Sequence, residues 1–300
     1  MSSSTNILKN GTVFFDVKTK NKSFIKVSAE LKKNGIDSYL FPLMIYDRDL
    51  IGVDPFDEEN LSNEMKAKIA IEVKRNFWYF IREIARVPAS GGDGIQFELH
   101  RGNLAMLFCL LLNLDTSIEL PRQHYKTYSA VFFYIWTLLF NAKNYEIVFS
   151  NKSYSDTTRN LKRLTDVIDK DKKYIPTYLR SSMSPEDTNN QERLTLKKSN
   201  NTIRVVSPQN TREKADQAGR GMSTPLIWID EMALILIGAF LLATVINHFS
   251  NCWELLNKDN QQRSLLMILL IGTFNDYSER KYIQVNGNGK LLYLIYKMKI

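Results

Sequence analysis

The sequence predicts an α/β fold, with a mainly parallel sheet and helices on both faces. Continuously apolar segments such as LIWI (226–229) and LLMILLI (265–271) have the composition of parallel strands that are buried on both sides. Segments with apolar residues at three-and-four spacing alternate with them, as amphipathic helices do. The 300 residues are 44% hydrophobic and 24% charged, which is ordinary for a folded protein and excludes disorder as the main state.

The expected elements follow one another in a regular order after an irregular, polar subdomain at residues 1–60. Helices are expected at 61–86, 99–112, 128–140 and 155–169, and strands at 117–120, 145–151, 201–208, 226–231 and 265–276. PASGGDG at 88–94 interrupts the first helical pattern, because glycine and proline break helices. Residues 170–202 are polar and turn-rich. We therefore expect a main domain at 61–276 and a short tail at 277–300.

The charge is unevenly distributed along the chain. The formal net charge is +8, and residues 151–220 alone contain 15 basic and 9 acidic residues. A local basic excess favours an anionic partner such as nucleic acid, whereas an equally weighted alternative is a solvated, loop-rich face. If the segment binds DNA, Lys162, Arg163 and Lys172 are the expected contacts.

Nothing at the start of the chain resembles a secretory signal, and no segment is expected to cross a membrane. The longest apolar run, at 232–246, has 15 residues, whereas a membrane span needs about 20. The two cysteines, Cys109 and Cys252, cannot form a disulfide framework, and they belong to no CxxC motif. A reducing, cytoplasmic setting is expected.

PRQHYKTYS (121–129) lies between an apolar strand and an apolar helix, where a phosphate-binding loop is expected. Lys126 would neutralise phosphate charge, and the hydroxyl of Thr127 would bind Mg²⁺. The segment has no glycine, and a Lys-Thr pair taken alone is more often part of a surface loop.

LIWIDE (226–231) places two acids at the carboxyl end of a buried strand, where ligands bind in open α/β sheets. Asp230 would hold the hydration shell of Mg²⁺, and Glu231 would activate the attacking water. A strand followed by a helix with acidic first residues is the plain alternative. Thr273 and Asn275 follow another buried strand, where they either contact the γ-phosphate or form a simple turn.

Four segments, in order along the chain, resemble the ATPase part of large terminase subunits, the motors that package DNA into the heads of tailed phages. The segments are FELHRGNLAML (97–107), PRQHYKT (121–127), RGMSTPLIWIDE (220–231) and GTFND (272–276). The resemblance implies a P-loop NTPase fold over 61–276. It also implies ATP hydrolysis with Mg²⁺, coupled to translocation of double-stranded DNA into the prohead.

The resemblance also implies roles for individual residues. The nucleotide-binding residues would be Asn103, Gln123, His124, Tyr125, Lys126, Thr127 and Tyr128, with Asn103 at the adenine. Arg122 would stabilise charge on the γ-phosphate in the transition state, while Arg159 and Arg220 are alternative fingers that act across a ring. Thr273 and Asn275 would couple hydrolysis to movement.

The implied partners are double-stranded DNA, the phage portal and the small terminase subunit, in the cytoplasm of the host cell. A homo-oligomeric ring is expected on assembly, without membrane association. The segment after Asp276 contains one acid, Glu279, so no endonuclease activity is expected, and the nuclease half would be encoded separately.

The sequence departs from the family at Tyr125, because the family has glycine directly before the lysine. A Cβ there is expected to narrow the loop or to hold φ negative. Two alternatives therefore stay open: a catalytically weak or inactive DNA-binding or assembly fragment, and a helicase-type ATPase that depends on nucleic acid.

Overall fold

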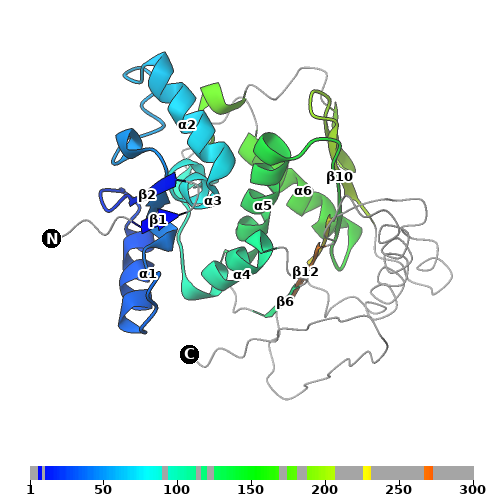
Figure 1. Cartoon of the computed structure of the whole chain (residues 1–300). Coiled ribbons are helices and arrows are strands. Elements are labelled where there is room, and N and C mark those ends of the chain that lie inside the picture. Colours follow the sequence, from blue (N-terminus) through cyan, green and yellow to red (C-terminus); the bar gives the residue numbers. More distant parts are fainter. Residues whose placement is uncertain are drawn as a thin grey trace, which may run out of the picture.

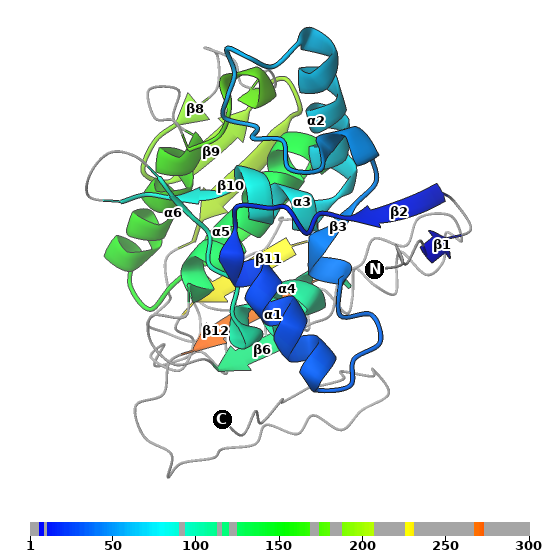
Figure 2. The same cartoon turned by 90° about the vertical axis from the view of Figure 1, so that its left-hand side faces the viewer.

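A seven-stranded sheet in the order β6-β12-β11-β7-β10-β9-β8 organises the fold of this computed structural model. The structure describes residues 6–8, 11–89, 94–112, 116–119, 125–168, 174–180, 188–206, 226–230 and 267–272. The strands of the sheet are β6 (Thr116–Glu119), β7 (Glu146–Ser150), β8 (Thr188–Asn189), β9 (Arg193–Leu196), β10 (Asn201–Val205), β11 (Leu226–Asp230) and β12 (Met267–Gly272). In Figure 2 the labelled strands β8, β9, β10, β11, β12 and β6 follow one another from the upper left to the lower part of the view.

The sheet is mixed, which confirms the α/β class but adds an antiparallel edge that the sequence pattern did not predict. Strands β6, β12, β11, β7 and β10 pair in parallel, and β9 and β8 continue the sheet in antiparallel pairing. The prediction of a turn-rich region over 170–202 was wrong where β8 and β9 form. Leu194 and Leu196 of β9 are buried, so this short strand contributes two apolar side chains to the core in an otherwise polar stretch.

The described helices form two layers beside the sheet. They are α1 (Lys22–Lys33), α2 (Asn63–Arg75), α3 (Phe77–Tyr79), α4 (Arg101–Leu111), α5 (Lys126–Trp136) and α6 (Tyr154–Ile168). Two π-helical turns, η3 (Phe80–Ile84) and η4 (Thr137–Asn141), extend α3 and α5, and three short 3₁₀ turns lie at Phe41–Leu43, Arg48–Leu50 and Thr177–Arg180. Figure 1 places α4, α5 and α6 between the sheet and the N-terminal helices.

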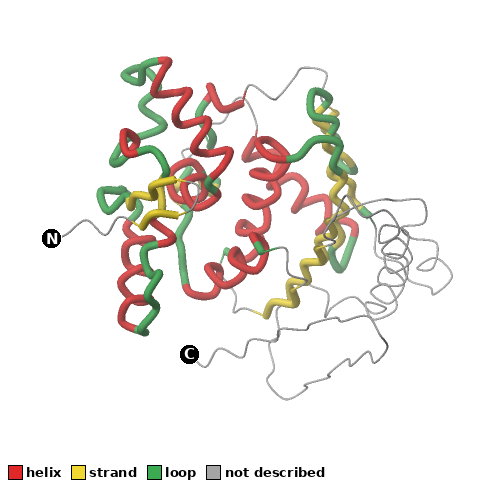
Figure 3. Tube along the Cα trace, in the orientation of Figure 1, coloured by secondary structure: helices red, strands yellow, loops and turns green. Residues whose placement is uncertain are grey.

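Strand β11 packs against α5 through aromatic side chains. The ring of Trp228 stacks on Tyr134 of α5 at a centroid distance of 5.1 Å, and it lies 4.3 Å from the ring of Phe149 on the neighbouring strand. The described helices that pack on the sheet lie on one side of it (Figure 3). The four helical ranges predicted from the sequence lie, apart from residue 169, in the described part of the chain, so the expectation of helices on the second face stays a prediction.

Residues 1–60 are more regular than predicted. They contain helix α1 and a small antiparallel sheet of β1 (Asn6–Leu8), β2 (Gly11–Phe15) and β3 (Met44–Ile45). Phe24 of α1 and Ile45 of β3 belong to the same hydrophobic core as Trp78 and Trp228. The described part of this segment therefore packs as one body with the residues that follow it.

The helix predicted over 61–86 is interrupted at Asn76, which has an extended backbone with φ −130° and ψ 96°. Its side-chain oxygen accepts a hydrogen bond from the Tyr79 N–H at 3.2 Å and caps the next helix. Its amide donates to the Met44 carbonyl at 2.9 Å and to Glu72 at 2.7 Å. These hydrogen bonds stabilise the extended backbone at Asn76 more than continuation of the helix would. Asparagine is also a favoured N-cap residue.

None of the helices in the described part of the chain has the length and hydropathy needed to cross a membrane.

Asn201 ties the end of the α5–η4 helix to the sheet. Its side chain is fully buried, and its oxygen accepts from the Tyr145 N–H at 2.9 Å. Its amide donates to the carbonyls of Leu138 at 2.8 Å and Ala142 at 2.9 Å. One side chain therefore satisfies three backbone groups where the chain passes from helix to β7.

Replacing Asn201 with alanine is expected to lower the free energy of unfolding by about 2–3 kcal/mol, because it leaves buried backbone groups without partners. Chemical denaturation of parent and variant measures this difference. Ser199→Ala is the matched control, since its hydroxyl makes a single long bond of 3.4 Å, and it is expected to stay within about 0.5 kcal/mol of the parent. Equal losses in the two variants would contradict the anchoring role.

Candidate nucleotide site

The carboxyl ends of four neighbouring strands meet at one edge of the sheet. Glu119, the last residue of β6, is in register with Gly272, the last residue of β12. Asp230, at the end of β11, is in register with Ile271, and Ile229 with Ser150 of β7. Because all these strands run in parallel, the segments that follow them leave from the same edge, where α/β sheets bind ligands.

Each of the three segments that the sequence analysis selected includes or follows one of these strand ends in the sequence. Helix α5 begins at Lys126, seven residues after β6 ends at Glu119. Thr273 and Asn275 come directly after β12, and Glu231 directly after β11. The predicted site residues that lie outside the described part of the chain are Arg122, Gln123, His124, Lys172, Arg220, Glu231, Thr273 and Asn275.

Tyr125 adopts the left-handed conformation directly before α5, with φ 51° and ψ 24°. The expectation that its Cβ would hold φ negative was therefore wrong. Its carbonyl accepts hydrogen bonds from the Ser129 N–H at 2.8 Å and the Ser129 hydroxyl at 2.9 Å. Its ring stacks on His100 at 6.1 Å and lies 5.9 Å from Phe97. These contacts offset the cost of a backbone that glycine adopts more readily.

The first turn of α5 carries Lys126, Thr127 and Tyr128, all half-buried. The geometry of a helix leaves its first N–H groups without intrahelical partners and gives this end a partial positive charge. The pKa of the Tyr128 phenol is raised above its ordinary value, mainly by burial, and the nearby positive charge of Arg163 only partly opposes this rise. Tyr128 also stacks on Phe132 at 6.0 Å, so its ring packs within the helix layer.

Asn103, the predicted adenine contact, is fully buried at the start of α4. Its oxygen accepts from the His100 N–H at 2.7 Å, and its amide donates to the Glu98 carbonyl at 2.9 Å. This residue therefore shapes the turn that places His100 against Tyr125. Its contact with a nucleotide stays a prediction.

Asp230 is only 5% exposed and faces the helix layer, as Trp228 does two residues earlier in the strand. Its Oδ2 accepts a hydrogen bond at 2.9 Å from the amide of Asn160 on α6. Asn160 in turn accepts a hydrogen bond from the guanidinium of Arg163. The carboxylate at the end of β11 is therefore held by a side chain from the helix that follows β7.

Lys162 and Arg163 differ in their surroundings, although both were predicted as DNA contacts. The Lys162 side chain is 73% exposed and pairs with Asp166 at 3.2 Å. Arg163 is partly buried and bonds Asn160, so it belongs to the side of α6 that faces Asp230. The count of basic and acidic residues over 151–220 could not show that Lys162 is exposed and Arg163 is partly buried.

Sequence reasoning missed Asn160, but a signal was present. The buried positions of α6 are Thr157, Asn160, Leu161, Leu164, Val167 and Ile168, spaced as one face of a helix. An asparagine within an otherwise apolar stripe needs buried hydrogen-bond partners. That position could have been marked as a polar contact to the sheet.

Among the described residues, no group of three or more histidine, cysteine, aspartate or glutamate side chains lies close enough to hold a metal ion. The oxygen donors at this edge, the carboxylate of Asp230 and the hydroxyl of Thr127, are of the type that Mg²⁺ prefers. Mg²⁺ commonly uses one or two carboxylates together with substrate phosphates and water. The donor set therefore fits Mg²⁺ delivered with a nucleotide better than a cage made by the protein alone.

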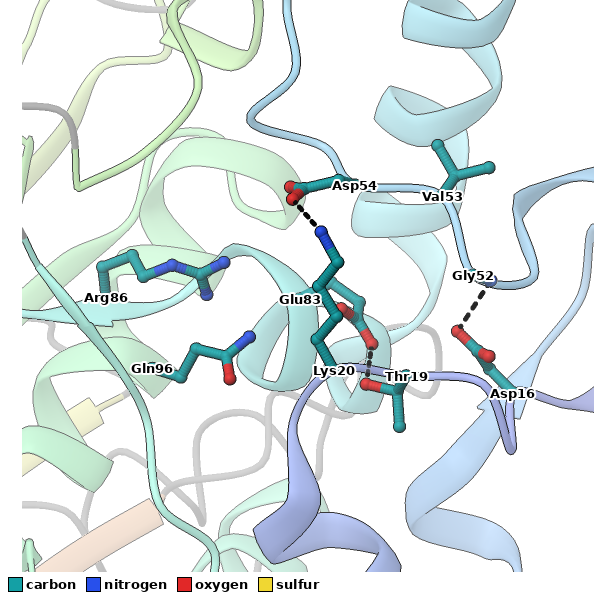
Figure 4. A pocket seen from close by; sticks show the side chains of 9 residues that line it. All are labelled: Asp16, Thr19, Lys20, Gly52, Val53, Asp54, Glu83, Arg86 and Gln96. Atoms are coloured by element: carbon teal, nitrogen blue, oxygen red, sulfur yellow. Dashed lines mark hydrogen bonds and ion pairs between the residues drawn. The ribbon is translucent and has the colours of Figure 1, made fainter.

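A small pocket lies elsewhere, beside the hairpin of β4 (Arg86–Val87) and β5 (Ile95–Gln96). Figure 4 shows Lys20 donating to Asp54 at 2.9 Å and the Thr19 hydroxyl donating to Glu83 at 2.6 Å across it. Its lining consists of Asp16, Thr19, Lys20, Gly52, Val53, Asp54, Glu83, Arg86 and Gln96. None of the predicted site residues lines it, and these contacts join lining residues to one another. We therefore place the candidate site at the sheet edge.

The positive φ of Tyr125 predicts an unusual order of stability for two substitutions. Tyr125→Gly and Tyr125→Ala both remove the aromatic ring, but only alanine retains the strained Cβ, so glycine is expected to be more stable by about 1 kcal/mol. Thermal or chemical unfolding of the two variants measures the difference. The same pair at Asn34, an exposed residue with φ −87° after α1, is the control, and there glycine should have no advantage. Alanine equal to or better than glycine at 125 would contradict the left-handed assignment.

Comparisons with known proteins add little to this geometry. Neither a protein-family model nor a curated protein sequence matches the chain. Among solved structures, the fold is similar to the large terminase of bacteriophage HK97, with a TM-score of 0.43 and 14% sequence identity. That similarity covers 66% of this chain and 37% of the terminase, so the chain spans well under two thirds of that protein.

Proposed function

We propose that the chain is the ATP-hydrolysing motor domain of a phage large terminase, which couples hydrolysis to translocation of double-stranded DNA into the prohead. The observation that carries the proposal is the parallel alignment of β6, β12 and β11. The resemblance of the four segments was inferred from residue type and order, without knowledge of the strand pairing. In the sheet, β6, β11 and β12, the strands that precede or lie in three of those segments, end at the same edge.

ATP would bind as its Mg²⁺ complex between the loop before α5 and Asp230. Lys126 lies in the first turn of α5, where its ammonium group and the helix N-terminus both favour phosphate. Thr127 and Asp230 would bind the Mg²⁺, which neutralises phosphate charge when it is bound. We propose the P-loop NTPase type from the resemblance and from the order of a strand, a segment ending in Lys-Thr, and a helix along the chain.

Hydrolysis requires a base and a source of positive charge near the γ-phosphate. Glu231 follows Asp230 directly in the sequence and would orient and deprotonate the attacking water. Arg122 would stabilise the charge that develops on the transferred phosphoryl group. Thr273 and Asn275, after β12, would respond to the loss of the γ-phosphate.

Translocation requires contacts with DNA that do not depend on base sequence, and phosphate contacts meet this requirement. The outer face of α6 carries Lys162, whose side chain is 73% exposed. Its ion pair with Asp166 is solvent-exposed and therefore weak, so a phosphate can compete for the cation. Lys172 would extend this basic surface.

The proposal includes the partners that such a motor needs. These are the phage portal, the small terminase subunit and a separately encoded nuclease half, in the cytoplasm of the host cell. Assembly into a homo-oligomeric ring would place an arginine such as Arg159 or Arg220 of one subunit near the nucleotide of its neighbour.

Two substitutions are expected to separate binding from chemistry. Lys126→Ala removes a charge-assisted contact and should weaken ATP-Mg²⁺ binding by about 1.5–3 kcal/mol, as measured by calorimetry. Glu231→Gln should retain binding but abolish phosphate release, because only the activation of water is lost. Lys143→Ala, an exposed lysine beyond the other end of α5, is the control for loss of a positive charge.

Equal ATP affinity in the parent and Lys126→Ala would refute the nucleotide site. A parental hydrolysis rate in Glu231→Gln would show that the base is a different residue. Binding without any hydrolysis in the parent would favour the inactive fragment instead.

Charge reversal at Lys162 on α6 and at Lys172, which follows α6 in the sequence, is expected to weaken binding of duplex DNA of every sequence alike. Lys162→Glu combined with Lys172→Glu should also reduce the slope of log affinity against log salt, by roughly one for each phosphate that the protein no longer neutralises. Arg163 is left intact in this variant, because it bonds Asn160.

Lys26→Glu with Lys33→Glu on α1 makes the same change in net charge at another exposed surface and serves as the control. DNA affinity that falls equally in both variants would point to net charge rather than to a binding face. Unchanged DNA affinity at low salt in the variant with Lys162→Glu and Lys172→Glu would mean that these two lysines do not contact DNA.

A further inference from the structure

The strongest unassigned feature is a buried polar chain of three side chains behind the sheet edge. Asn160 is 3% exposed and Asp230 is 5% exposed, and the two lie 70 residues apart in the sequence. The amide of Asn160 donates to Asp230 Oδ2 at 2.9 Å, while Arg163 donates to the oxygen of the same amide. Burying polar side chains costs free energy unless they have hydrogen-bond partners, so these three hydrogen-bonded side chains have a specific role in this fold.

The chemistry of the three groups fixes the direction of every hydrogen bond. An ionised carboxylate only accepts, and a guanidinium only donates. An asparagine amide has both a donor and an acceptor on one rigid plane, so it can join the other two in one orientation only. Arg163 therefore fixes the amide plane of Asn160, and Asn160 fixes one oxygen of Asp230.

Helix α6 is itself anchored to the strand next to β11. The hydroxyl of Thr157 accepts from the Asn151 N–H at 3.0 Å, directly after β7 ends. The same hydroxyl donates to the Ser153 carbonyl at 2.8 Å. The start of α6 is therefore tied to the carboxyl edge of the sheet, which gives Asn160 a defined distance from Asp230.

We propose that Asn160 and Arg163 are positioning residues for the metal-binding carboxylate Asp230, an inference that rests on the proposed ATP-Mg²⁺ site. The hydrogen bond from the amide to Oδ2 restrains the orientation of the Asp230 carboxylate at the end of β11, the edge where nucleotide and Mg²⁺ would arrive. Loss of the amide donor removes this restraint and raises the cation concentration needed for nucleotide binding.

Asn160→Leu tests this role, because it keeps the approximate size of the side chain while it removes the amide that donates to Asp230. The Mg²⁺ concentration for half-maximal ATP binding, measured by calorimetry, is expected to rise about tenfold, as for loss of a hydrogen bond to a charged group. Arg163→Met keeps the apolar stem and is expected to raise the same midpoint about threefold, since it only frees the amide plane. Mn²⁺ in place of Mg²⁺ should show the same order.

Thr165→Ala is the matched control on α6, since the Thr165 hydroxyl bonds only to the Lys162 carbonyl of its own helix among the described groups. Its midpoint should equal that of the parent. The melting temperature of each variant separates positioning from stability, because a purely structural role lowers it without moving the Mg²⁺ midpoint.

An unchanged midpoint in Asn160→Leu, with Mg²⁺-dependent ATP binding in the parent, would overturn this inference and leave the proposed function standing. If Asn160→Leu does not fold, Arg163→Met decides in the same way. A parent that binds no ATP-Mg²⁺ would overturn both proposals together.

Discussion

Parallel pairing of β6, β12, β11 and β7 is the constraint on which the rest of the structure depends. Strands that run in the same direction end at the same edge, so residues far apart in the chain become neighbours there. Two parallel strands that follow one another in the chain need a crossover connection, which runs back along the sheet. Helix α5 provides it between β6 and β7, and helix α6 lies in the connection between β7 and β10. Those helices bury one face of the sheet, with Trp228 stacked against Tyr134, and thereby fix where their own N-termini lie.

Two deviations from regular structure are stabilised at this edge. Tyr125 holds a left-handed backbone directly before α5, and its ring contacts with His100 and Phe97 offset the strain. Asn160 interrupts the apolar stripe of α6, and its bonds to Asp230 and Arg163 offset the cost of burying an amide. Local irregularities that persist only through surrounding contacts concentrate at functional sites. Their presence here agrees with the choice of this edge over the small pocket near Lys20.

Much of the element order was predictable, because long periodic or continuously apolar segments carry a strong local signal. Helices α4 and α6 and strands β7 and β11 lie close to their predicted ranges. The break at Asn76 was not predictable from periodicity, since its amide is engaged by the Met44 carbonyl from another element. The antiparallel strand β9 was missed for a related reason, because this four-residue strand lies between β10 and β8 and is stabilised by pairing with them and not by its own composition.

The sequence by itself determined the α/β class, the acidic end of β11 and the Lys-Thr pair that opens α5, because these depend on residue type and local spacing. Only the tertiary structure decided that β12 lies between β6 and β11, and that Arg163 faces the site while Lys162 faces outward. It also decided that Asn160 meets Asp230 across 70 residues of sequence. Such pairings arise from strand order and from the rotation of a helix against the sheet, which depend on packing between distant segments and leave no local pattern.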